Sequence, residues 1–104
     1  MKVRIRSTPQ ADQQTIHAAV WWRSNRPKAP RLFREELTGV LSLLAAAPEM
    51  GASVRHATIP SLRRVLLPAT QYHIYYVYDE LANEIVVLGV WSARRGRPPK
   101  LSRS

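Results

Sequence analysis

The feature that most constrains the fold is the segment from residue 84 to residue 92, EIVVLGVWS, near the C-terminus. In a β-strand, successive side chains point to opposite faces. Alternation therefore divides its apolar residues into two sets: Ile85, Val87, Gly89 and Trp91 on one face, and Val86, Leu88 and Val90 on the other. A strand that is apolar on both faces is typical of a sheet interior. The upstream part of the chain is expected to provide cover for this sheet.

Two more strands precede this one along the chain. Residues 72–78, YHIYYVY, are rich in aromatic and β-branched side chains, and the polar residues 79–83 have the length of a hairpin connection. Residues 62–67 predict an earlier strand, which the proline-containing segment 68–71 joins to the next one through a turn. The sequence therefore predicts three antiparallel strands in meander order.

The N-terminal part predicts an edge strand followed by a helix. Residues 2–6 alternate between basic and apolar side chains, which indicates a half-buried strand at a sheet edge. Thr8 and Pro9 then predict a helix start, because a hydroxyl can cap free amides and a first-turn proline needs no N–H. This helix is predicted to end near Asn25. Its apolar side is predicted to comprise Ile16, Ala19, Val20, Trp21 and Trp22.

A second helix is predicted from about Pro30 until Pro48 stops it. Apolar residues recur on one of its faces at helical spacing: Phe33, Leu37, Val40, Leu41 and Leu44. Residues 48–61 are expected to form a loop. The predicted fold is α+β, an antiparallel sheet of about four strands with an N-terminal helical hairpin packed on one face, in the order β-α-α-β-β-β. Its opposite face is expected to stay partly uncovered, as a place for function.

Composition narrows the class of protein. Residues 1–97 fit a single domain, and residues 98–104 are expected to form a basic, flexible tail. The absence of cysteine excludes zinc ribbons, thiol catalysis and disulfides. No segment approaches the roughly 18 consecutive apolar residues of a membrane span, and the N-terminus does not read as a signal peptide, so a soluble cytoplasmic protein is expected.

Charge is the strongest feature of the composition. The chain contains sixteen Lys and Arg residues and seven Asp and Glu residues, which gives a net charge of +9. Such a charge favours a polyanionic partner, either nucleic acid or an acidic protein segment. The cations cluster toward the C-terminus: Arg94, Arg95, Arg97, Lys100 and Arg103.

Several residues together carry a family resemblance. They are the Met50-Gly51 pair after Pro48, the Arg63-Arg64 pair, the segment YHIYYVYD and the segment IVVLGVWSARRGR. On these features, over nearly its whole length, the chain resembles the ParE/RelE superfamily of toxins from bacterial toxin–antitoxin operons. The resemblance implies a small basic toxin without a cofactor, neutralised by a cognate acidic antitoxin. It also implies one of two targets, since ParE-like members poison DNA gyrase and RelE-like members cut messenger RNA in the ribosome.

The candidate site residues favour the first target. RNA cleavage through the 2′-hydroxyl needs a base, cations for the phosphorane charge and an acid for the leaving oxygen. By resemblance, Arg64 stands at a first basic position of RelE-like proteins, Leu66 replaces the second, and His73 stands where a strand arginine is usual. Arg94, Arg95 and Arg97 match the basic residues after the last strand, but the C-terminal tyrosine or histidine is missing. We therefore expect a gyrase inhibitor in which these arginines and Arg64 contact the target.

Two alternatives stay open. His73 has a suitable unperturbed pKa for a nuclease base, with Arg64 as its cation, although a lone histidine among aromatic residues is also typical of packing. The segment Arg95-Gly96-Arg97-Pro98 resembles the core of an AT-hook, which inserts into the minor groove of A·T-rich DNA. His17 and His56 have no ligand spacing with His73, so no metal site is predicted.

Overall fold

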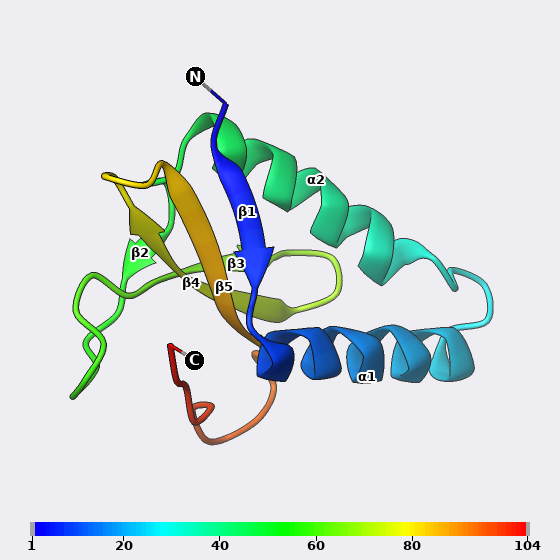
Figure 1. Cartoon of the computed structure of the whole chain (residues 1–104). Coiled ribbons are helices and arrows are strands. Elements are labelled where there is room, and N and C mark those ends of the chain that lie inside the picture. Colours follow the sequence, from blue (N-terminus) through cyan, green and yellow to red (C-terminus); the bar gives the residue numbers. More distant parts are fainter. Residues whose placement is uncertain (1, 104) are drawn as a thin grey trace.

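A five-stranded sheet, with two helices on one of its faces, organises the chain (Figure 1). The computed structural model describes residues 2–103. Met1, the first residue of the predicted domain 1–97, and Ser104, the last residue of the predicted tail 98–104, lie outside the described residues. The elements are β1 (Arg4–Ser7), α1 (Pro9–Asn25), α2 (Leu32–Ala46), β2 (Ala52–Ser53), β3 (Arg63–Leu67), β4 (Tyr72–Asp79) and β5 (Glu84–Ser92). This order confirms the predicted α+β fold.

The strand order across the sheet is β1-β5-β4-β3-β2. It confirms the antiparallel meander of β3, β4 and β5, the interior position of β5 and the edge position of β1. Two details differ from the prediction. Strand β1 runs parallel to β5, with Ile5 beside Ile85, which is possible because the long helical connection lets the chain return in either direction. The expected loop also contains β2, whose two residues are too few to show a periodic pattern.

The helix boundaries follow from their ends. The Thr8 side chain accepts a hydrogen bond from the Ala11 backbone N–H at 3.2 Å, and Pro9 occupies the first helical turn, as predicted. Helix α1 ends at Asn25, and α2 begins at Leu32, two residues after Pro30. Figure 1 shows the helices diverging from the turn that joins them.

The buried face of α1 matches the prediction at Ala19 and Trp22 but not at Ile16, Val20 and Trp21. Ile16 and Val20 are 47% and 45% exposed, and Trp21 is 43% exposed. The core instead receives small residues and one large ring: Ala11, Ala18, Ala19 and Trp22. Small side chains let α1 approach β5 closely, which a stripe of large residues would prevent. On α2 the predicted face is confirmed, since Phe33, Val40 and Leu44 are buried and Leu37 and Leu41 pack against the same core.

A β-bulge between β4 and β5 changes which residues share a face. Tyr75 lies opposite Gly89 whereas Tyr76 lies opposite Val87, so Leu88 is an extra residue in β5. Beyond the bulge the alternation shifts by one residue. Val90 therefore packs on the helix side with Ile85 and Val87, and Trp91 turns to the opposite side with Val86 and Leu88. The predicted faces of β5 are correct before the bulge and wrong after it.

The opposite face of the sheet carries a second apolar cluster rather than an open surface. Its buried members are Ile59, Leu62, Tyr75, Val77, Val86 and Leu88. Leu101 packs against this cluster, Pro99 is buried, and the Gln10 side chain donates a 2.6 Å hydrogen bond to the Lys100 carbonyl. Leu101 thus places part of the segment that was expected to be a flexible tail against this face, and in Figure 1 the segment turns back toward the sheet.

Candidate target-binding site

The basic arm, residues 94–97, leaves the end of β5 through a turn that is held at both strands. The Ala93 N–H donates to the Gln71 carbonyl at 2.8 Å, just before β4 begins. The Arg94 N–H donates to the Ser92 hydroxyl, and the Arg95 N–H donates to the Ser92 carbonyl, both at 3.2 Å. These bonds fix where the arm starts relative to the sheet.

The Trp91 side chain supports the arm by contacting two of its arginines. The Arg95 guanidinium carbon lies 4.0 Å from the centroid of the Trp91 ring, and that of Arg97 lies 6.0 Å from it. The Trp91 indole N–H also donates to the Arg97 carbonyl at 2.9 Å. A cation over an aromatic face contributes about 0.5–1 kcal/mol at exposed sites. Trp91, expected only as a core residue, thus orients two arm arginines, and the bulge is what turns its ring toward them.

Strands β3 and β4 bring further predicted residues to the same place. His73 pairs with Trp91 across β4 and β5, and Arg64 pairs with Tyr75 across β3 and β4. One Arg64 guanidinium nitrogen donates to the Tyr75 hydroxyl at 3.4 Å, and the rings of His73 and Tyr75 lie 6.0 Å apart, edge to face. Arg63 lies outside this site, because its guanidinium points toward the segment between α2 and β2 and donates hydrogen bonds to the backbone carbonyls of Glu49 and Gly51.

Side chains from β3, β4, the end of β5 and the arm line one pocket of about 260 Å³, which we call the arm pocket. Four of the predicted site residues meet there: Arg64, His73, Arg95 and Arg97. Arg94 lines a neighbouring hollow on the helix side instead. Tyr75 and Trp91 are the lining residues that the sequence did not single out for this site. The run of aromatic residues in β4 was a signal for Tyr75, whereas strict alternation placed Trp91 on the other face.

The site is positively charged without internal neutralisation. No carboxylate lines the arm pocket. Within residues 2–103 the ion pairs are those of Arg4 and Arg6 with Glu84, so Arg64 and the arm arginines have no acidic partner there. Unpaired arginines on a rigid support favour binding of carboxylates or phosphates, which match the planar guanidinium.

The titration of His73 is shifted by its surroundings. Burial lowers the pKa of the His73 imidazole below its ordinary value, and the positive charge of Arg64 lowers it further. His73 is therefore neutral at pH 7, a state in which it can accept a proton. Its neighbour Tyr75 is 4% exposed and holds its hydroxyl against Arg64. The arm itself supplies guanidinium groups and no residue that titrates near neutrality.

Metal ligands do not gather at this site. Within residues 2–103 there is no group of three or more His, Cys, Asp or Glu side chains that could hold a metal ion. His17 lines a hollow beside α1, and His56 accepts a hydrogen bond from the Thr58 N–H in the loop before β3. None of the helices in the described part of the chain is long and apolar enough to cross a membrane.

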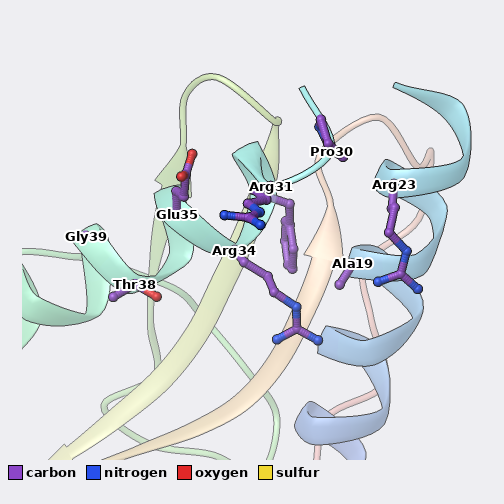
Figure 2. A pocket seen from close by; sticks show the side chains of 9 residues that line it. Ala19, Arg23, Pro30, Arg31, Arg34, Glu35, Thr38 and Gly39 are labelled. Carbon is purple, nitrogen blue, oxygen red and sulfur yellow. The ribbon is translucent and has the colours of Figure 1, made fainter. Parts of the chain in front are cut away.

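A larger hollow of about 850 Å³ lies between the two helices, and we call it the hairpin hollow. Phe33 and Ala19, which are 1% and 5% exposed, give it an apolar floor. Arg23 from α1, Arg31 just before α2 and Arg34 from α2 stand around it together with the Glu35 carboxylate, and Figure 2 shows Arg34 reaching toward α1. This hollow and the arm pocket share no residue, so they are separate surfaces.

The fold is that of small toxins from toxin–antitoxin systems. The structure is similar to a solved structure described as the chromosomal ParDE TA system from P. aeruginosa, with a TM-score of 0.69 and 14% identity, over 88% of this chain and 97% of that one. It is also similar to a mutant of the E. coli toxin RelE in the free state, with a TM-score of 0.56 and 18% identity, over 90% of this chain and 86% of that one.

The sequence supports a narrower assignment. A family model described as the ParE toxin of type II toxin–antitoxin system, parDE, matches residues 5–97. No curated protein matches the chain. The chain belongs to the ParE toxin family, and it is the toxin component of a type II toxin–antitoxin system with a cognate antitoxin as its partner.

Proposed function

We propose that this toxin inhibits DNA gyrase in the bacterial cytoplasm, and that the basic arm and Arg64 contact an acidic surface of gyrase or of the gyrase–DNA complex. The observation that carries the proposal is the arm itself. Arg95 and Arg97 are held over Trp91, the arm arginines have no acidic partner in residues 2–103, and residues 94–97 themselves include no histidine, tyrosine or carboxylic acid. Such an arm is built for charge recognition rather than for proton transfer. Membership of the ParE family supports the same target class.

Ribosome-dependent cleavage of messenger RNA is the second candidate. The arm pocket favours it in one respect, because a neutral His73 lies beside Arg64 and the arm cations. The pocket offers no clear acid for the leaving 5′-oxygen, since Tyr75 is nearly buried and its hydroxyl contacts Arg64. The nuclease hypothesis therefore has a candidate general base, His73, but no general acid in the arm pocket to protonate the leaving oxygen.

DNA binding by the Arg95-Gly96-Arg97-Pro98 segment alone has less support. An AT-hook enters the minor groove as a free extended segment, and both of its arginines insert into the groove. In this chain the side chain of Arg95 lies on Trp91 and the carbonyl of Arg97 accepts the indole hydrogen bond. The segment would have to leave both contacts to bind DNA in that way.

The antitoxin is proposed to occupy the hairpin hollow. The hollow has an apolar floor, and three arginines outnumber the one carboxylate, Glu35, around it. This lining suits an amphipathic acidic segment, whose apolar side chains would pack on Phe33 while its carboxylates pair with the arginines. The edge strand β1 offers a further place for the antitoxin beside the helices. Target and antitoxin would then use different surfaces of the toxin.

The arm is tested by the triple variant Arg94→Ala, Arg95→Ala, Arg97→Ala in a gyrase supercoiling assay on plasmid DNA. We expect the folded triple variant to lose inhibition, because the cations that meet the acidic target are gone. A matched control removes the same charge elsewhere: Lys28→Ala, Arg55→Ala and Arg103→Ala, all exposed and outside the arm pocket. The control should inhibit as the wild type does. Equal inhibition by both variants would remove the arm from the mechanism.

A further inference from the structure

A second aromatic and basic surface lies on the helix side of the arm and adjoins the arm pocket, with which it shares Trp91, Ser92 and Arg95. Two adjoining hollows of about 320 and 300 Å³ share Trp21, Tyr72 and Arg95. Arg94 lines the first hollow, and Gln14 and His17 line the second. We call these two hollows together the tryptophan hollow. It joins the C-terminal half of α1 to the ends of β4 and β5.

Trp21 is the unusual residue of this surface. Its side chain is 43% exposed on α1, whereas the adjacent Trp22 is 9% exposed and donates its indole N–H to the Ala29 carbonyl. The Arg26 guanidinium carbon lies 5.2 Å from the Trp21 ring centroid, which helps to hold the exposed ring in place. Packing within the fold explains Trp22 but leaves much of the Trp21 ring in solvent.

Polar groups in the tryptophan hollow remain available to a ligand. The Gln14 side-chain oxygen accepts the Val90 N–H at 2.8 Å, and the Gln14 amide N–H groups make no hydrogen bond within residues 2–103. Arg94 and Arg95 have no acidic partner in the same residues. None of the lining residues of either hollow is a carboxylate. A ring, two cations and free amide donors thus converge on one acid-free surface.

We propose that the tryptophan hollow binds an unpaired nucleotide of single-stranded nucleic acid, with a base stacked on Trp21 and the flanking phosphates on Arg94 and Arg95. Proteins that bind single strands without strong sequence preference combine aromatic platforms with a basic path for the backbone. Hollows of about 300 Å³ suit one base each, and the free Gln14 amide can donate to a base carbonyl. An acidic peptide would satisfy the arginines but would leave the exposed ring without a stacking partner.

Arg94 and Arg95 also belong to the arm of the gyrase proposal, so the two proposals are distinguished by Trp21, which lies outside the arm pocket, and by a direct measurement of nucleic-acid binding. The probes are a fluorescently labelled oligothymidylate, the matching oligouridylate and a DNA duplex with the same number of phosphates. Fluorescence anisotropy measures the binding of each probe at several salt concentrations. Stacking on an aromatic side chain contributes about 1–3 kcal/mol per base, so Trp21→Ala should weaken single-strand binding roughly 5- to 150-fold. Arg94→Ala should lower the salt dependence by about one phosphate contact.

The controls separate stacking from charge. Val20→Ala alters an equally exposed neighbour on α1 outside both hollows and should bind as the wild type does. Trp21→Phe keeps a ring and should restore most of the binding, and duplex binding should be unchanged in Trp21→Ala. A preference between the two single strands would identify DNA or RNA as the natural source. Circular dichroism establishes that each variant is folded.

Three results would overturn the inference. The first is wild-type affinity of folded Trp21→Ala for both single strands. The second is an equal loss of single-strand and duplex binding, which would reflect charge alone. The third is binding of polyglutamate that depends on Trp21 while binding of the oligonucleotides does not, which would make the surface a docking site for an acidic protein segment.

Discussion

At the scale of single residues, a few side chains satisfy backbone groups that the secondary structure leaves free. The Glu36 carboxylate on α2 accepts hydrogen bonds from the N–H groups of Ala69 and Thr70, at 2.6 and 2.9 Å, and from the Thr70 hydroxyl at 2.7 Å. The Tyr76 hydroxyl donates to the Pro48 carbonyl and accepts from the Gly51 N–H. Each such side chain ties a helix or strand to the loop beside it.

Glu36→Ala should lower the free energy of unfolding by about 1–3 kcal/mol, because it leaves the nearly buried Thr70 hydroxyl and two N–H groups without their acceptor. Urea denaturation followed by circular dichroism measures the difference. Glu35→Ala on the same helix turn is the control, since Glu35 is exposed and holds no such turn. Equal effects of the two variants would show that the carboxylate contacts do not stabilise the fold.

His73 gives the fold a pH dependence whose sign follows from its lowered pKa. The unfolded chain takes up a proton near pH 6.5, whereas the folded chain resists protonation because of burial and Arg64. This contribution to stability is therefore fully present above about pH 6.5 and is lost as the pH falls from there toward the folded-state pKa. Melting temperatures at neutral and mildly acidic pH should differ less in His73→Gln than in the wild type. An unchanged difference would contradict the assignment.

At the scale of elements, periodicity predicted the elements that repeat regularly and missed the local departures from it. The helical spacing of Phe33, Val40 and Leu44 predicted the buried face of α2, and alternation predicted the β-meander. Alternation does not reveal the bulge at Leu88, because β5 is apolar on both faces and its sequence looks the same with or without an extra residue in the pairing. The family resemblance placed Arg64 and His73 in the candidate site, whereas the bulge concealed the supporting role of Trp91.

The tail offers an element-scale test. A Cβ added at Gly89 would lie 2.6 Å from a terminal methyl carbon of Leu101, so Gly89→Ala should push this flexible side chain aside and loosen the contact between the tail and the sheet. Limited digestion with trypsin should then cut after Lys100 faster than in the wild type, whereas the Arg97-Pro98 bond resists trypsin in both. Gly39→Ala is the matched control, because a Cβ there meets nothing within 4 Å. If the two alanine variants are cut at equal rates, Leu101 does not hold the tail.

At the scale of the whole molecule, the charge of +9 is arranged on distinct surfaces. Three arginines surround the hairpin hollow, and another group surrounds the end of the sheet where β5 becomes the arm. Strong single-sign surfaces speed the encounter with acidic partners and weaken as salt rises. Under the proposed function, the antitoxin would bind between the helices while the arm contacts the target.

The measurement that tests the central claim most directly exposes the purified wild-type toxin to both targets in parallel. One reaction follows supercoiling and cleavage complexes of gyrase on plasmid DNA, and the other follows messenger RNA in a translating extract. The arm, supported on Trp91 and lacking a titrating side chain, predicts inhibited supercoiling with intact messenger. Codon-specific cuts in the messenger with normal supercoiling would contradict the account and assign catalysis to His73 and the arm pocket.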